Sequence, residues 1–299
     1  MSARRIVLLL GTTAALAGAL MTALVAGAVG KGSGSNTCLV PGVGETIDQA
    51  WQPNMPAAIS YAHSRVGDIA FAVRTDHRFW GYRYTHDEWS ASVVKAMLLT
   101  AYLDMPSVSN RDLNGNDTSL LTPMIEVSDN NAAQQVFNIV GQGGLQALAN
   151  RVGMKHFATS SIWGETEIDA ADQTHYFLHI DSYIPRRHRA YAMHLLASIT
   201  PSQRWGVGEV APKGWDLYFK GGWGYGTGLL DHQVALFVRG CSRVSIAVLT
   251  MHDGSHPYGM DTLKGLFLRL LNGGLPTQPV SWQLPGKPPK GQPVDKPVG

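Results

Sequence analysis

The sequence predicts an α/β protein of the α+β kind, with a five-stranded antiparallel sheet built from both chain ends and an inserted all-helical subdomain. Two strand-like runs lie early in the chain and three lie late, whereas residues 90–198 are mainly helical in their spacing. Strands at both ends with helices between them indicate one sheet that receives a helical insertion. Because the strands follow one another as in hairpins, we expect them to be antiparallel.

The first elements are a helix and a hairpin. Residues 46–64 have helical spacing, which Pro53 and Pro56 interrupt. Residues 68–74 alternate and are rich in strand-forming types, and after a short turn residues 79–84 have the same character. We expect these two runs to pair with each other.

The last elements are three strands and a helix. Strand-like runs cover residues 215–220, 233–239 and 243–251, and a final helix is expected over about 260–271. No internal repeat is visible. We therefore interpret residues 36–272 as one globular unit.

Neither chain end is expected to belong to the fold. Residues 1–35 have a basic start and then no charge from Ile6 to Gly30, which is typical of an export signal. The signal could be cleaved near 26–28 or kept as a membrane anchor, since the run is long enough to span a bilayer. Both alternatives put the remaining chain outside the cytoplasm. Residues 273–299 are rich in proline and predict an extended tail.

Composition excludes several classes of protein. With 299 residues, of which 44% are hydrophobic, the chain is too apolar to be disordered. A net charge of +2 argues against a nucleic-acid binder. Two cysteines are too few for a disulfide-rich miniprotein, but they can form one bridge. We expect a Cys38–Cys241 disulfide outside the cytoplasm, with two unpaired thiols as the alternative.

The first motif that could take part in catalysis lies at the start of an expected helix, residues 91–103. Lys95 is the only charged residue in this strongly apolar segment, and Ser92 precedes it by about one helical turn. A lysine whose pKa is lowered by burial can take a proton from a serine hydroxyl. The alternative is that Lys95 extends from the helix end to solvent and Ser92 is merely small.

Two further motifs follow. Ser128-Asp129-Asn130 precedes a helix and could relay protons and bind a substrate amide, although these residue types are also preferred at helix N-termini. Lys220-Gly221-Gly222-Trp223 ends a strand-like run, and its glycines would let a substrate backbone lie against the strand edge. An ordinary hairpin start is the alternative for this second motif.

The order of the three motifs resembles the S-x-x-K, S-D-N and K-T-G pattern of the serine β-lactamase and penicillin-binding-protein superfamily. The resemblance is greatest to class A β-lactamases and covers about residues 45–272. It implies a serine acyl-enzyme without a cofactor or a metal. Ser92 would attack an amide carbonyl, with Lys95 as the base or part of its network. Ser128 would relay a proton to the leaving nitrogen, helped by Lys220.

The resemblance also implies how substrate is bound. Asn130 would orient the acyl amide, and Gly222 and Trp223 would lie beside the substrate backbone. The N–H groups of Ser92 and Trp223 would form the oxyanion hole. Lys220-Gly221-Gly222 lacks the hydroxyl of K-T-G, which helps hold the substrate carboxylate in the family. The next strand has no arginine for that purpose, and His232 is the nearest cationic candidate.

The base for hydrolysis of the acyl-enzyme is the largest departure from the class A pattern. Glu165 is the candidate, in a degenerate version of the family's E-x-x-L-N, and Glu167 is close by. A helix is expected directly afterwards, at Ala170, so most of the family's Ω-loop is missing. Alternatively, both acids simply favour the start of that helix.

Other polar groups are interpreted as structural. His175 and His179 are expected in the core or at the surface rather than as a metal pair, and the same holds for His252 and His256. Residues 186–189 form a basic, solvated loop that could meet an anionic wall polymer. We expect no metal site.

The sequence therefore predicts an exported, monomeric serine hydrolase that acts on amide bonds through a Ser92 acyl-enzyme. Its substrates would be small-molecule β-lactams or peptidoglycan peptides, and it would not bind nucleic acid. One alternative is a D-Ala-D-Ala carboxypeptidase-like penicillin-binding protein. Another is a non-catalytic cell-wall-binding module on the same fold.

Overall fold

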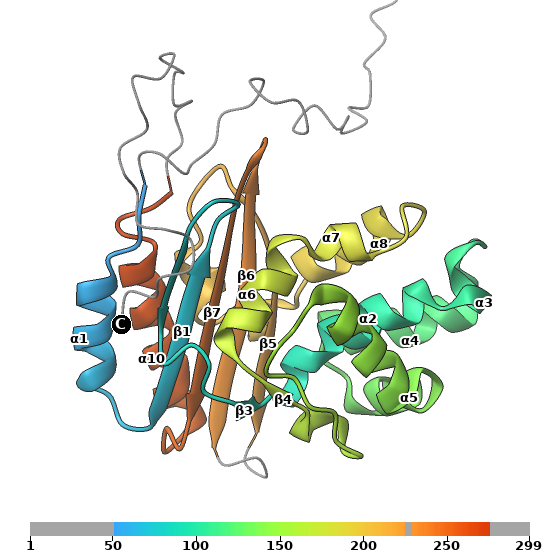
Figure 1. The fold of residues 1–299 in the computed structure, drawn as a ribbon, viewed down its shortest axis with the longest axis horizontal. Helices are drawn as coiled ribbons and strands as arrows, with labels where there is room; N and C mark the ends of the chain where they lie inside the picture. Colours follow the sequence, from blue (N-terminus) through green and yellow to red (C-terminus); the bar gives the residue numbers. More distant parts are fainter. Residues whose placement is uncertain (1–50, 225–228, 276–299) are drawn as a thin grey trace, which may run out of the picture. The chain divides into compact units, whose positions relative to one another are not determined.

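A five-stranded antiparallel sheet is the central element of the protein (Figure 1). The computed structural model describes residues 51–224 and 229–275. The spatial order of the strands is β2-β1-β7-β6-β5. Early β1 pairs with late β7, which confirms the predicted sheet built from both chain ends. The strands are β1 (Asp68–Arg74), β2 (Phe79–Tyr82), β5 (Asp216–Gly224), β6 (Leu230–Arg239) and β7 (Ser242–Met251).

The observed strands differ from the predicted ones mainly at their ends. β2 stops at Tyr82 rather than Tyr84, because Arg83 has a φ of 47° and turns the chain out of the extended conformation. β5 continues beyond Lys220 to Gly224, since its glycines pair with β6. Glycine has a low strand propensity, which hid this extension from the sequence pattern.

Two helices cover one face of the sheet, α1 (Met55–His63) and α10 (His256–Leu270) (Figure 1). Within the described part of the predicted helix 46–64, α1 begins at Met55, because Asn54 caps it by accepting a hydrogen bond from the N–H of Ala57. α10 begins earlier than expected, since Ser255 caps it in the same way. The two helices approach closely where Gly265 of α10 lies against the Tyr61 ring.

The predicted helical insertion is confirmed, and its helices lie on the other face of the sheet and beside it (Figure 1). α6 contacts β1, β6 and β7, while α2 is central to the helical block and is buried along all but its last residue. The longer helices are α2 (Lys95–Asp104), α4 (Gly115–Glu126), α5 (Asn130–Val152), α6 (Ala170–Leu178) and α8 (Arg189–Ala197). The shorter helices of the block are α3 (Pro106–Ser109) and α7 (Ile180–Tyr183), whereas α9 (Val207–Val210) follows the block and packs against α10.

A second, two-stranded sheet joins the start of the helical block to a later loop. Strand β3 (Glu88–Trp89) pairs with β4 (Glu167–Ile168), and Ala158 bridges to Glu167. The sequence did not predict this sheet, because two-residue strands carry no measurable periodicity. Its effect is to hold the loop 158–168 beside the residues that lead into α2.

Several predictions fall outside the described residues. These are the export signal or anchor in 1–35, most of the proline-rich tail and Cys38, while its expected partner Cys241 lies in the turn between β6 and β7. Among the residues that the structure does describe, none of the helices is long and apolar enough to cross a membrane.

Candidate active site

Ser92 lies in a turn of 3₁₀ helix, η3 (Ala91–Val94), that leads directly into α2. The turn is tied to the later loop by a hydrogen bond from the N–H of Ser90 to the carbonyl of Thr166 (2.8 Å). Ala91 has a φ of 42°, a strained conformation for a residue with a side chain. Strain of this kind persists only where the surroundings enforce it, and it concentrates at functional sites.

Lys95 is fully buried, and its amine is surrounded by acceptors. It donates to the carbonyl of Ser128 (2.6 Å), to the Ser128 hydroxyl (3.1 Å) and to Oδ1 of Asn130 (2.8 Å). Its Nζ also lies 4.8 Å from the centre of the Trp163 ring. Burial lowers the pKa of Lys95 to about 7, against an opposing effect of the Asp129 carboxylate. A substantial fraction of this amine is therefore neutral near pH 7.

Lys220 approaches the same serine from the sheet. It is fully buried on β5 and donates to the Ser128 hydroxyl (3.1 Å) and to the carbonyl of Gly221 (2.9 Å). Burial, together with the charge of nearby Lys95, holds the pKa of Lys220 well below its usual range. Neither lysine has an ion-pair partner among the described residues.

The Ser128 hydroxyl thus connects two amines. An oxygen that accepts hydrogen bonds from both Lys95 and Lys220 keeps its own proton for a third partner. Ser128 lies in the loop just before α5, in a left-handed backbone conformation with a φ of 58°. This geometry can pass a proton from an amine, through the hydroxyl, to a group in front of it.

Gly222 brings the sheet against the serine turn. A Cβ at this position would lie 2.8 Å from the amide nitrogen of Ser92 and 2.9 Å from that of Val93. Only glycine permits this close approach. As a result, the segment of Ser92 and the segment of Trp223 lie side by side, and we expect their N–H groups to form the oxyanion hole.

An open cleft of about 330 Å³ lies over these groups. Its lining combines polar residues, among them Ser128 and Asn130, with two aromatic ones, Trp163 and Trp223. The lining residues are Ala91, Ser92, Ser128, Asn130, Ile162, Trp163, Gly164, Trp223 and Gly224. Nothing in the sequence marks Trp163 or Ile162 as site residues, because no motif identifies a side chain that a loop folds over a site.

The structure does not bring Glu165 into this group. A short 3₁₀ turn, η4 (Trp163–Glu165), presents Trp163 and Gly164 to the cleft, and Glu165 is not among the lining residues. Glu167 is exposed in β4 and lines a different cavity together with Trp89. The side chain that this loop sets against Lys95 is therefore the Trp163 ring.

His232 is wrong as the expected cation for a substrate carboxylate. It is fully buried, its Nδ1 accepts the N–H of Thr250 (3.1 Å), and its Nε2 donates to the carbonyl of Trp89 (2.9 Å). Burial lowers the pKa of His232 to about 4, so the ring is neutral at physiological pH. Its role is to tie β6 to β7 and β3.

His256 lies nearer to the cleft than the sequence suggested. Its ring stacks on Trp223 with centres 5.6 Å apart, and its Nδ1 is 2.5 Å from Oδ1 of Asp231. Burial and the neighbouring Asp253 carboxylate raise the pKa of Asp231 to about 9. Burial also lowers the pKa of His256. This neutral pair supports the Trp223 wall.

The remaining sequence candidates have structural partners. His252 contacts Asp68 rather than His256, and half-buried His179 faces Asp76. The basic loop is only partly solvated, because His188 is buried and bonded to the carbonyl of Val108 (3.0 Å).

The comparison with solved structures agrees with this architecture. A β-lactamase from Sphaerobacter thermophilus superposes with a TM-score of 0.64 and 15% identity, over 74% of this chain and 96% of its own. The chromosome-encoded β-lactamase of Vibrio parahaemolyticus gives 0.62 and 16%, over 72% and 97%. A reconstructed ancestral class A β-lactamase of Gram-negative bacteria gives 0.61 and 16%, over 73% and 98%. At these identities the likeness establishes the fold.

Sequence comparison establishes the family. No curated protein matches the chain significantly. The sequence model of the family described as "Beta-lactamase enzyme family" matches residues 116–266, a span that includes Ser128, Lys220 and Gly222 but not Ser92. That span is about half of the chain and lies within the fold that the three structures share. The chain therefore belongs to the β-lactamase enzyme family.

Proposed function

We propose that this protein is an exported serine hydrolase that cleaves amide bonds of β-lactams or cell-wall peptides through an acyl-enzyme at Ser92. The observation that carries the proposal is the chain of polar groups under the cleft. In it, two buried amines with lowered pKa values share the hydroxyl of Ser128 beside the serine turn. Burying two lysines without carboxylate partners costs folding free energy. Such groups with shifted pKa values are typical of sites that transfer protons.

Acylation follows from this arrangement in balanced steps. The Ser92 oxygen attacks the amide carbonyl and gives its proton to the neutral amine of Lys95, one turn away. The negative oxygen that forms is stabilised by the N–H groups of Ser92 and Trp223. Lys95 then donates a proton to the Ser128 oxygen, which it already contacts at 3.1 Å. As the C–N bond breaks, Ser128 gives its own proton to the leaving nitrogen.

Substrate would be held along β5. Asn130 supports an acyl amide, because its Oδ1 is bonded to Lys95 and its side chain lines the cleft. Gly222 itself packs against the serine turn, and the next residues of the strand, Trp223 and Gly224, line the cleft where a substrate backbone would lie. The aromatic walls of Trp163 and Trp223 favour a substrate with an apolar acyl group.

The decisive experiment is labelling with a fluorescent penicillin followed by intact-mass analysis. We expect one adduct per chain, lost in Ser92→Ala because the attacking oxygen is removed. Ser202→Ala, which changes an exposed serine outside the cleft, is the matched control and should label normally. Unchanged labelling of Ser92→Ala would refute the assignment. Absence of any adduct with the wild type would favour the non-catalytic wall-binding module.

A D-Ala-D-Ala carboxypeptidase-like activity is the second candidate. It is favoured by the cleft itself, because none of its described lining residues is a carboxylate that could activate water against a β-lactam ester. Release of D-alanine from a peptide ending in D-Ala-D-Ala, dependent on Ser92, would distinguish this activity from β-lactam hydrolysis.

A further inference from the structure

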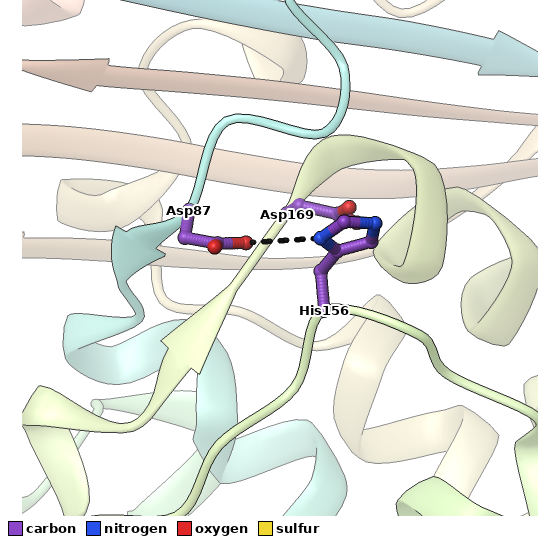
Figure 2. A group of neighbouring side chains, drawn as sticks. All are labelled: Asp87, His156 and Asp169. Atoms are coloured by element: carbon purple, nitrogen blue, oxygen red, sulfur yellow. Dashed lines mark ion pairs between the residues drawn. The ribbon is translucent and has the colours of Figure 1, made fainter.

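Three polar side chains from separate segments meet outside the cleft (Figure 2). Asp87 precedes β3, His156 lies in the loop after α5, and Asp169 begins α6. One oxygen or nitrogen from each lies within 4.8 Å of the other two. Oδ1 of Asp87 is 3.7 Å from Nδ1 of His156. No sequence motif joins these three residues, so the sequence alone does not predict a metal site.

Asp169 is the unusual member of this cluster. It is fully buried, and its Oδ1 caps α6 by accepting the N–H of Asp172 (2.6 Å). Its Oδ2 is also buried and has no hydrogen-bond partner among the described residues. A buried carboxylate oxygen without a partner is unfavourable unless a cation or a donor completes it. In Figure 2 the Asp169 carboxyl group lies beside the His156 ring.

The surroundings of the cluster are acidic. The carboxylate of Asp172 accepts the backbone N–H groups of Lys155 (2.6 Å) and His156 (2.7 Å), which holds the segment carrying His156 in place. Asp169 has no ion pair with another described residue, and the ion-pair partner of Asp87 is His156 itself. Among the described residues, no lysine or arginine side chain forms an ion pair with these carboxyl groups.

We propose that Asp87, His156 and Asp169 bind a divalent metal ion, with zinc as the preferred ion. One imidazole nitrogen and two carboxylate oxygens form a ligand set that suits zinc, whereas calcium and magnesium prefer oxygen alone. Zinc bonds to such ligands are about 2.0–2.2 Å long, so the three atoms must move closer together. The side chains of Asp87 and His156 are free to do so, since they are 48% and 42% exposed. Asp169 provides the fixed point.

The position of the site gives the ion a structural role. Asp169 ends the loop whose residues Trp163 and Gly164 line the cleft, and Asp87 begins the strand that pairs with that loop. An ion shared by both would fasten the loop to the segment leading to Ser92. This inference does not depend on the hydrolase activity, because the ion is held outside the cleft.

The test uses the full chain after removal of metals with a chelator. Titration with zinc chloride, followed by calorimetry and by thermal melting, should show one saturable site and a rise in melting temperature. Cobalt in place of zinc should give visible absorption bands of a nitrogen- and oxygen-bound ion. Magnesium and calcium chloride should bind more weakly.

Three variants locate the ion. Asp169→Asn keeps the helix cap, because asparagine is also a good cap, but removes the charge. This variant and His156→Ala should each weaken zinc binding at least about tenfold. His194→Ala, an exposed histidine on α8, is the matched control and should bind as the wild type does. The proposal fails if the wild type shows no saturable binding, if magnesium binds equally well, or if both cluster variants bind zinc normally.

Discussion

The chemistry of the candidate site depends on two amines that share one hydroxyl. Lys95 and Lys220 are buried close enough for the charge on one to disfavour the charge on the other. Ser128 separates them and accepts a hydrogen bond from each. Protonating one of the two amines is therefore easier than protonating both. This property suits a site that must accept a proton and then release it.

The pH dependence of acylation follows from Lys95. Its pKa is lowered to about 7, and only the neutral amine can accept the Ser92 proton. The rate of labelling by a fluorescent penicillin should therefore rise roughly tenfold per pH unit below the pKa and level off above it. A labelling time course that is quenched at set times, repeated between about pH 5 and pH 9, measures this profile.

Two controls accompany the profile. Lys95→Arg keeps a positive charge at every pH in this range and should label very slowly throughout. Circular dichroism at each pH would confirm that the fold is unchanged. A rate that does not vary with pH, or a midpoint near the ordinary lysine pKa, would contradict a role for Lys95 as base.

At this scale the sequence indicated the candidate residues but not their surroundings. Ser92, Lys95, Ser128 and Lys220 were singled out because three short motifs follow one another in the order of a known superfamily, although each motif alone also has a structural explanation. His232 was misjudged, since nothing in the sequence says that its two nitrogens meet the Thr250 N–H and the Trp89 carbonyl. Those partners come from strands distant in sequence.

Among the elements, the short sheet of β3 and β4 has the largest effect on the site. It holds the loop 158–168 so that η4 directs Trp163 to Lys95 and leaves Glu165 outside the cleft lining. The sequence indicated this loop as the place of the candidate base Glu165. It could not predict which side chain faces inward, because a single 3₁₀ turn decides that and has no sequence period.

The lifetime of the acyl-enzyme should reflect this loop. Hydrolysis needs a water molecule beside a base, and a base displaced by about 1 Å can lose on the order of a hundredfold in rate. We expect a penicillin adduct that persists for minutes or longer, measured by intact mass after removal of free drug. Because Glu165 does not line the cleft, Glu165→Gln should change this lifetime by less than about twofold and leave adduct formation unaffected.

A short-lived adduct would contradict this prediction. Rapid turnover of a chromogenic cephalosporin that disappears in Glu165→Gln would identify Glu165 as the base, and the protein would then be an efficient β-lactamase. Glu167→Gln, in the exposed strand β4, is the matched acidic control for that comparison.

For the whole molecule, the candidate site is a junction between parts that are distant in the sequence. η3 opens the helical block, while β5 belongs to the late part of the sheet, and the two pack together. The sequence predicted both parts and their order, since strand and helix periods are local. It could not show that Gly222 is the point of contact, because that depends on how the block sits on the sheet.

Gly222→Ala tests this junction. The added Cβ would come within 2.8 Å of the Ser92 nitrogen and within 3.0 Å of the Ser90 carbonyl, both of them backbone atoms that cannot rotate away. The serine turn or β5 must therefore shift. We expect the rate of penicillin labelling to fall by about a hundredfold, as for other displacements near 1 Å. The free energy of unfolding should fall by about 1–3 kcal/mol, as for overpacked cores.

Gly143→Ala is the matched control, because a Cβ there has no neighbour within 4 Å and the position lies within α5. It should label at the wild-type rate and be at least as stable, since alanine is the better helix former. If Gly222→Ala loses stability but labels normally, the contact supports the fold without setting the geometry of Ser92. If it labels slowly while melting like the wild type, the approach of β5 to η3 serves catalysis directly.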